Sequence, residues 1–357
     1  MNQFHYPSPG PPFPDVPPSP LREGFSPLLQ HLRNRIREQG LISFRDFMDA
    51  ALYHPQFGYY NSSRNPLGRE GDFYTSADLD SVFSKLLARR FNAMAEELSV
   101  SPDSFTIVEL GAGRGLLARD ILQSQKFPYR ILERSAAMRE RQGEVLQGLD
   151  VEWIEDLPKD LIGCVFSNEF FDALPVHRVV RRNGTLREIY LNEDFVEVEG
   201  DPQPGVDAPV GEGNLADISI DARDWVVRIA ESLKAGFHLA IDYGYLEREF
   251  YARPRGTLMC YWRHQVSEDP YVRVGEQDIT AHVNFSDLIE AGRAASLLTT
   301  DFSTQMDFLI RLGILDEMET LTSLGTAASV ERLQAMKKLI LPGNMGERFK
   351  VLVQRKS

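Results

Sequence analysis

A glycine-rich turn in the first third of the chain has the residue types and the spacing of a nucleotide-binding loop. The β-branched run 106–110 predicts a strand, and apolar residues recur with helical spacing over 116–122. Three glycines lie between them: Gly111, Gly113 and Gly115. Because glycine has no Cβ, a ligand can approach the backbone N–H groups at the helix start. We therefore expect a nucleotide to bind here, although a glycine turn needed only for packing has the same appearance.

The spacing of the glycines indicates which nucleotide binds. A dinucleotide fingerprint, G-x-G-x-x-G, requires a glycine at position 116, where the chain has Leu116. The observed pattern is E-x-G-x-G-x-G from Glu109, and a second acid, Glu133, ends the next predicted strand. An acid there binds ribose hydroxyls in doubly wound nucleotide folds. The pattern resembles that of class I S-adenosylmethionine-dependent methyltransferases. The resemblance implies that Glu109 and the glycine loop hold the methionine half of this cofactor.

Two carboxylates follow the predicted strand 163–167. In an open α/β sheet this strand end faces the ligand crevice, so we expect Glu169 and Asp172 near the transferred methyl group and Asn168 near the cofactor. A carboxylate matches the planar fork of a guanidinium, and it can accept a proton as the nitrogen attacks. We therefore expect Glu169 and Asp172 to be catalytic. The alternative is that they stabilise a helix N-terminus, an effect of about 0.3–1 kcal/mol.

Further candidate residues lie in loops and at other strand ends. Asp156 follows the predicted strand 151–154, where its carboxylate can accept from the adenine amine, unless it is only a surface turn acid. Substrate-binding candidates come from loops rich in aromatic and polar residues and from the carboxyl end of the predicted strand 237–244. They are Tyr59, Tyr60, Asp72, Thr75, Asp242, Tyr243 and His282. We expect no metal site, because neither Cys nor a nearby acid completes a ligand set around the histidines.

The composition excludes several classes of protein. The net charge of −13 over 357 residues argues against nucleic acid as a partner, since phosphate binding needs a basic face. Only Cys164 and Cys260 are present, so neither a disulfide framework nor a zinc quartet is expected. The sequence contains no run of eighteen apolar residues, so we expect no membrane span. The N-terminus lacks the apolar core of a secretory signal, so we expect a cytoplasmic protein.

The chain divides into three predicted parts. Residues 1–27 contain nine prolines and predict a disordered tail. Residues 28–100 predict helices and loops that cover the cofactor site. Residues 101–357 predict the methyltransferase domain, an α/β fold with a doubly wound, mostly parallel Rossmann-like sheet whose final edge strand is 349–354. A β insertion at about 178–220, built on the hairpin signal Asn183-Gly184, interrupts this domain.

Many motifs in the same order resemble the MidA family of class I methyltransferases. The resemblance runs from about Leu28 to the end of the chain and includes NEFFDALP (168–175), DITAHVNF (278–285) and MGERF (345–349), with further matches at 44–48, 51–55, 58–60, 71–76, 108–115, 242–244 and 255–256. Two positions depart from the family: Ala77-Asp78 stands where Pro-Glu is usual, and Asn284 where Asp is common.

The resemblance implies an activity and a partner. Mitochondrial members of the family are complex I assembly factors that methylate an arginine of a partner subunit. We therefore expect an S-adenosyl-L-methionine-dependent enzyme that methylates an arginine of a partner protein, possibly a subunit of respiratory complex I. Two alternatives stay open: a small-molecule methyltransferase, since fold does not fix function, and a non-catalytic assembly chaperone that binds the cofactor.

Overall fold

The computed structural model describes residues 26–62 and 80–357. Most of the predicted proline-rich tail lies outside these ranges, as do the candidates Asp72 and Thr75. The first helix, α1 (Pro27–Gln39), begins within the range predicted as tail. Proline is favoured there because the first helical N–H has no partner inside the helix. None of the described residues forms a helix long and apolar enough to cross a membrane.

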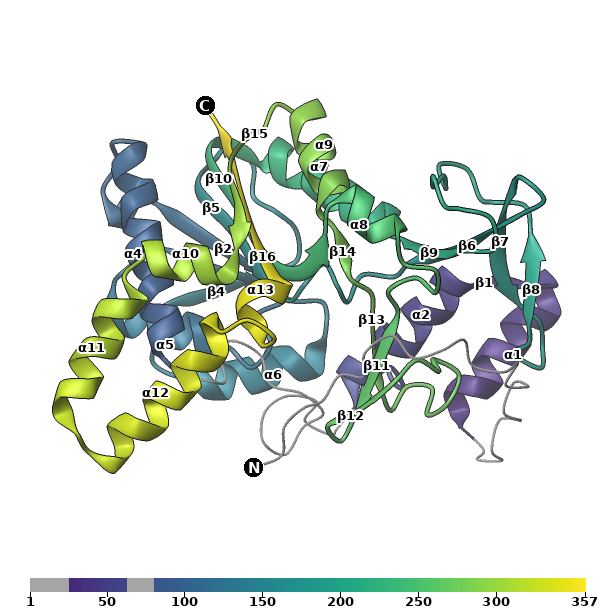
Figure 1. Cartoon of the computed structure of the whole chain (residues 1–357), viewed down its shortest axis with the longest axis horizontal. Helices are drawn as coiled ribbons and strands as arrows, with labels where there is room; N and C mark the ends of the chain where they lie inside the picture. Colours follow the sequence, from purple (N-terminus) through teal and green to yellow (C-terminus); the bar gives the residue numbers. More distant parts are fainter. Residues whose placement is uncertain (1–25, 63–79) are drawn as a thin grey trace.

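In the part of the chain that the structure describes, the largest sheet has eight strands (Figure 1). Its main order is β15 (Leu298–Thr304), β16 (Phe349–Lys356), β10 (Leu233–Tyr245), β5 (Leu161–Asn168), β2 (Thr106–Leu110), β3 (Tyr129–Leu132) and β4 (Val151–Ile154). The eighth strand, β14 (Val283–Asn284), pairs with the end of β10. The strands from β10 to β4 are parallel, whereas β16 is antiparallel to β10. The predicted doubly wound, mostly parallel sheet is therefore confirmed.

The prediction of β16 as the edge strand was wrong. β16 lies between β10 and β15 and pairs antiparallel with both. Gln354 near its end is fully buried, and its Oε1 lies 2.9 Å from His238 Nδ1. The true edge, β15, has the polar sequence LTTDFST, which does not alternate clearly. The helix that follows it, α10, begins at Gln305.

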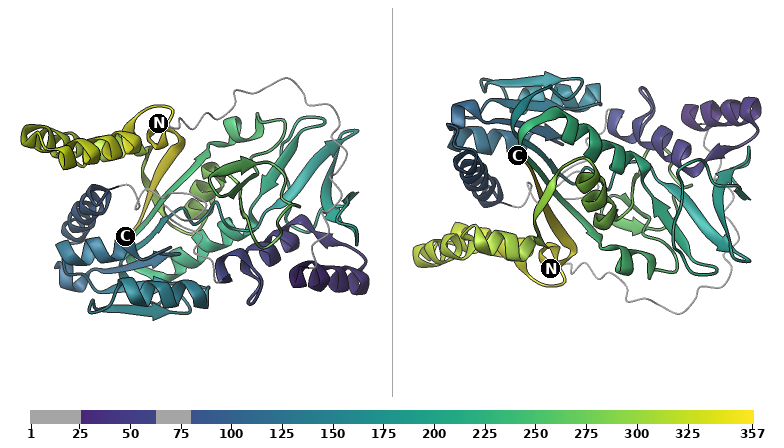
Figure 2. Two further views of the ribbon diagram at one scale, coloured as in Figure 1. Left: turned by 90° about the horizontal axis from the view of Figure 1, so that it is seen from below. Right: turned by 90° about the horizontal axis from the view of Figure 1, so that it is seen from above.

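Helices cover both faces of the sheet. On one face, apolar side chains pack against Phe166 and Phe237 of the sheet. They come from α4 (Val82–Glu97), α5 (Leu116–Ser124), α10 (Gln305–Arg311), α11 (Ile314–Leu324) and α12 (Ala327–Ile340). The other face packs against α7 (Ile220–Ser232) and α9 (Phe285–Ala294). Between β3 and β4 the chain forms α6 (Ala136–Val145), and α8 (Glu247–Tyr251) and α13 (Met345–Arg348) are short. Figure 2 shows the hairpin of α11 and α12 projecting from one end of the molecule.

The predicted β insertion forms a separate five-stranded sheet. It contains β6 (His177–Arg182), β7 (Thr185–Leu191), β8 (Glu197–Gly200), β9 (Leu215–Ile218) and, from the N-terminal region, β1 (Ile42–Ser43). A three-stranded sheet follows from β11 (Met259–Trp262), β12 (Gln265–Ser267) and β13 (Asp278–Thr280). The N-terminal α2 (Phe44–Tyr53), with apolar residues of α1, packs against side chains from both small sheets. The described residues also form two short 3-10 helices, η1 (Tyr59–Asn61) and η2 (Pro102–Ser104).

Candidate active site

The glycine turn joins β2 to α5 and has a backbone that other residues rarely adopt. Gly111, Gly113 and Gly115 have φ angles of 61°, 52° and 79°, in the left-handed region that favours glycine. A Cβ on Gly111 would lie 3.0 Å from the Phe170 ring. Gly115 is the N-cap of α5 and packs near Leu146, so its role is to turn the chain into the helix.

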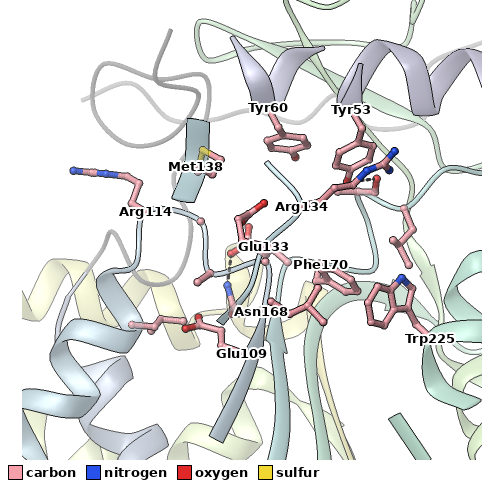
Figure 3. A pocket seen from close by; sticks show the side chains of 18 of the residues that line it. Tyr53, Tyr60, Glu109, Arg114, Glu133, Arg134, Met138, Asn168, Phe170 and Trp225 are labelled. Carbon is pink, nitrogen blue, oxygen red and sulfur yellow. Dashed lines mark hydrogen bonds between the residues drawn. The ribbon is translucent and has the colours of Figure 1, made fainter. Parts of the chain in front are cut away.

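A cavity lies at the carboxyl ends of β2, β3 and β5 (Figure 3). This is where an open α/β sheet binds its ligands. Seven of the predicted site residues line this cavity: Glu109, Gly111, Gly113, Glu133, Asn168, Glu169 and Tyr60. The structure therefore brings the glycine turn, the candidate ribose acid Glu133 and the catalytic candidate Glu169 into one place.

Glu133 is held in position by two hydrogen bonds. Its Oε1 accepts from the Ser135 N–H (2.8 Å), and its Oε2 accepts from Gln142 Nε2 (3.2 Å). The same Gln142 amide donates to the carbonyl oxygen of Gly113 (2.9 Å), while Gln142 Oε1 accepts from the Trp153 indole (2.9 Å). Gln142 thus fixes the glycine turn relative to Glu133. Sequence reasoning missed this residue, because a single glutamine on α6 carries no pattern.

Glu109 lies at the floor of the cavity and is buried. Its Oε2 accepts a hydrogen bond from the Tyr129 hydroxyl at 2.7 Å. Burial raises the pKa of Glu109 to about 7, and this hydrogen bond opposes the rise. A carboxyl group with such a pKa changes its charge near neutral pH, at the position where a cationic ligand group would meet it.

The loop after β5 is fixed by an acid from the neighbouring strand. The buried carboxylate Oδ2 of Asp242 accepts from the backbone N–H groups of Phe170, Phe171 and Asp172, at 3.0–3.3 Å. Glu169 precedes these residues with a φ of 54°, which is rare for a residue with a side chain. Its carboxylate accepts from Asn168 Nδ2 at 2.9 Å. Asp242 therefore holds the backbone that presents Glu169 to the cavity, and does not itself line it.

Asp172 lies behind the cavity wall. The Tyr243 hydroxyl hydrogen-bonds its carboxyl group, whose Oδ1 has no hydrogen-bond partner. Burial raises the pKa of Asp172 to about 6. Tyr243 is itself enclosed by His282 and Phe349, with ring centroids 5.0 and 5.5 Å away. Asp172 and Tyr243 are therefore buried together and do not line the cavity.

Two tyrosines from the N-terminal region form the wall that faces Glu133 (Figure 3). Tyr53 and Tyr60 stack with ring centroids 5.5 Å apart. The Tyr53 hydroxyl donates to the Ala173 carbonyl (2.9 Å), and the Tyr60 hydroxyl donates to Asp278 Oδ1 (3.0 Å). Burial and the Asp278 carboxylate raise the pKa of Tyr60, so its hydroxyl stays protonated. Tyr53 lies on an amphipathic helix and was not predicted.

Several predicted residues lie away from the cavity. Asp156 is exposed and pairs with Arg228, Oδ1 to Nη2, at 2.7 Å. His282 lines a second, smaller cavity, and its buried Nδ1 has no hydrogen-bond partner. Tyr59 is buried in the core of the N-terminal helices. Within the described ranges, no three His, Cys, Asp or Glu side chains are grouped so that they can hold a metal ion.

The residues of the cavity fit a nucleoside with an amino-acid tail. Gly111 and Gly113 of the glycine turn line the cavity, and Glu133 lines the same space, where a carboxylate suits ribose hydroxyls. The buried Oδ1 of Asn168 has no hydrogen-bond partner, so an acceptor is available for an ammonium group. These features match S-adenosylmethionine.

Comparisons with known proteins point to the same ligand. The Methyltransf_28 family model, described as S-adenosyl-L-methionine-dependent methyltransferases, matches residues 86–303. The Homo sapiens protein arginine methyltransferase NDUFAF7, mitochondrial, is 30% identical over 92% of this chain and 83% of that protein. The Drosophila melanogaster homologue is 28% identical over 75% and 70%. A Burkholderia thailandensis protein bound to S-adenosyl-homocysteine has a TM-score of 0.84 and 30% identity, covering 92% of each chain.

Proposed function

The chain belongs to the Methyltransf_28 family of S-adenosyl-L-methionine-dependent methyltransferases, and we propose that it methylates an arginine side chain of a partner protein. The observation that carries the proposal is the carboxylate of Glu169, which lines the cavity while Asp242 fixes its loop. A carboxylate in this position suits a guanidinium in charge and in shape. The relatives named protein arginine methyltransferases support the same substrate.

When bound, the cofactor supplies an electrophilic methyl group on a sulfonium sulfur. The chain's part is to align a nitrogen with that methyl group and to exclude water. In this proposal Glu169 orients the guanidinium, and Tyr60 forms part of the surrounding wall. As the nitrogen took the methyl group, the sulfur–methyl bond would break with its electron pair left on the cofactor's sulfur, and Glu169 would accept the proton that the nitrogen releases. Asp172, three residues after Glu169 and bonded by the Tyr243 hydroxyl, adds negative charge that favours a cationic substrate.

The proposed partner is a protein, and the family resemblance implies a subunit of respiratory complex I. We propose a cytoplasmic location, where the two buried cysteines stay reduced. The animal relatives are named mitochondrial. The insertion sheet of β6 to β9 stands beside α2, whose Tyr53 lines the cavity, so it offers a docking surface for the partner.

Methyl transfer into a proteome tests this proposal. The purified protein is incubated with S-adenosylmethionine carrying a labelled methyl group and with a lysate from a strain that lacks the gene. Labelled methylarginine in the hydrolysed protein fraction is expected. Label confined to small molecules would contradict a protein substrate and support the small-molecule alternative. Tight cofactor binding with no transfer to any fraction would instead support a non-catalytic assembly chaperone.

Cofactor affinity is expected to depend on pH through Glu109. Because burial raises its pKa to about 7, Glu109 is protonated below neutral pH and ionised above it. The ionised form attracts the cationic cofactor, so affinity should rise as the pH increases from 6 to 8 and should level off above. Calorimetry at several pH values in buffers of different ionisation enthalpy measures this rise and the proton released on binding. Glu109→Gln should bind more weakly, with a flat profile; a rise that persists in this variant assigns the titration to another group.

A further inference from the structure

The N-terminal residues 26–62 pack on the small sheets and not on the large one. Their buried apolar side chains, from α1, β1, α2 and η1, share one cluster with residues of the insertion sheet and of the sheet of β11 to β13. Among the described residues, the two apolar clusters on the faces of the eight-stranded sheet contain no member from 26–62. Yet Tyr53 and Tyr60 of this region line the cavity at the strand ends of that sheet. The contacts that hold them there are therefore of another kind.

Two ion pairs join α2 to elements that border the cavity. Arg45 Nη2 lies 2.7 Å from Oδ2 of Asp221, in the first turn of α7. One turn further along α2, Asp49 Oδ1 lies 3.0 Å from Nη1 of Arg134, in the loop after β3. Asp221 and Arg134 both line the cavity, and α7 adds Trp225 to its lining. The pairs thus connect α2 with the walls of the cavity.

The segment after α2 is held by hydrogen bonds. The carbonyl oxygen of Tyr60 accepts from Ser135 Oγ, and that of Ser62 accepts from Arg141 Nη2, both at 2.8 Å. Tyr53 adds the bond from its hydroxyl to a carbonyl of the loop after β5. Residues 45–62 therefore meet the eight-stranded sheet and its helices along a polar seam, which consists of the two ion pairs and these three hydrogen bonds.

A polar seam opens at a smaller cost than an apolar core. The side chains of Arg45 and Asp221 are 29% and 28% exposed, so water reaches the pair and can replace each partner when the two separate. Separation along the seam also leaves both apolar clusters of the large sheet intact. In Figure 3, Tyr53 and Tyr60 lie on the opposite side of the cavity from Glu109. Movement of the two tyrosines away from Glu109 would open the cavity on that side.

We propose that residues 26–62 form a cap that closes over the cofactor cavity, and that the pairs Arg45–Asp221 and Asp49–Arg134 form the latch that holds the cap closed. Closure surrounds the cofactor and excludes water, and opening admits and releases it. The latch residues bond to each other across the seam. The latch therefore acts on how fast the cofactor enters and leaves, and little on how tightly it binds. The proposal concerns the cofactor alone, so its failure would leave the proposed arginine methylation to be judged separately.

Surface plasmon resonance on the immobilised full-length protein tests the latch. The probe is S-adenosylhomocysteine, which lacks the positive charge of the sulfonium, so the loss of a nearby charge does not change its attraction to the cavity. Arg45→Gln and Asp49→Asn each remove one ion pair and keep a polar side chain. Each should raise the rate constants of association and of release together by about twofold to fivefold, the scale of one exposed ion pair. The dissociation constant should stay within about twofold of the wild type.

Salt and a matched control separate the latch from a general loosening of the cap. Raising NaCl from about 0.05 M to about 0.5 M should speed both steps in the wild type and have little effect in the double variant of Arg45→Gln and Asp49→Asn, because salt screens exposed pairs. Arg35→Gln removes a pair of similar exposure, Arg35–Asp46 at 2.8 Å, which joins α1 to α2 within the cap. Its rate constants should equal those of the wild type. Thermal unfolding of each variant controls for folding.

Three results would overturn the proposal. The first is wild-type rate constants in a double variant that unfolds at the wild-type temperature. The second is faster release with unchanged association, so that affinity falls in proportion, which would place the pairs in the binding site itself. The third is an equal change in Arg35→Gln and Arg45→Gln, which would assign the effect to the cap as a whole and not to the seam.

Discussion

Glu169→Gln is expected to lower the rate of methyl transfer by about a hundredfold or more, the scale of a lost general base, while cofactor affinity stays within about threefold. The amide keeps the size of the side chain and can still occupy the space beside Asn168. It removes the negative charge that orients a guanidinium and the oxygen that receives its proton. Transfer of labelled methyl groups to the protein fraction measures the rate, and calorimetry with S-adenosylhomocysteine measures the affinity.

The matched control for this variant is Glu155→Gln. Glu155 follows β4, its side chain is 91% exposed, and it does not line the cavity. The same chemical change there should leave both rate and affinity unchanged. If Glu169→Gln keeps the wild-type rate, the proposed role of Glu169 is wrong. If it loses rate and cofactor affinity together, Glu169 belongs to the cofactor site and not to the substrate.

Gly113→Val is expected to reduce cofactor affinity by more than about a hundredfold, from two effects that add. Gly113 has a φ of 52°, where a β-branched residue is strained by roughly 1–3 kcal/mol. The valine side chain also removes the open backbone that the ligand approaches. Because Gln142 bonds the Gly113 carbonyl, a shift of this backbone is passed on to Glu133 as well. Calorimetric titration with S-adenosylmethionine measures the loss.

A glycine with a positive φ outside the cavity separates the backbone strain of the valine from the loss of ligand access. Gly148 has a φ of 83°, and a Cβ there meets no heavy atom within 4 Å. Gly148→Val should therefore lower the melting temperature while leaving cofactor affinity unchanged. Parallel titration with NADH is expected to show no binding to the wild type, because Leu116 occupies the third position of the dinucleotide fingerprint. Wild-type affinity in Gly113→Val would reduce the turn to a packing feature.

The sequence predicted those parts of the fold that depend on local patterns. β2, β5 and β10 are apolar runs buried on both faces, and the glycine turn has a spacing that only a few ligands explain. β15 was missed because its sequence, LTTDFST, lacks the clear alternation of apolar and polar residues by which a strand is recognised. α11 was missed because only two residues, Leu312 and Gly313, separate it from α10.

In the candidate site, too, some residues could be predicted from local patterns and others could not. Glu133 and Glu169 could be found because each directly follows a strand, and strand ends meet at one edge of a parallel sheet. Gln142 and Trp225 could not, because on an amphipathic helix a glutamine resembles a surface residue and a tryptophan resembles core. Asp242 was predicted as a site residue, but it was expected to contact the substrate. Its bonds go to the loop after β5, and a strand end alone does not show whether its carboxylate faces a ligand or a neighbouring backbone.

The position of β16 inside the sheet has a consequence for synthesis on the ribosome. β15 ends at Thr304 and β16 begins at Phe349, so four helices, α10 to α13, leave the exit tunnel between the two strands. Among the described residues, β15 pairs with β16 alone. One edge of β10 also pairs with β16 and stays unpaired until that strand is made. The nascent chain therefore carries two open strand edges until β16 is made, and open edges promote pairing with other chains. Binding by a chaperone is expected to matter most in this interval.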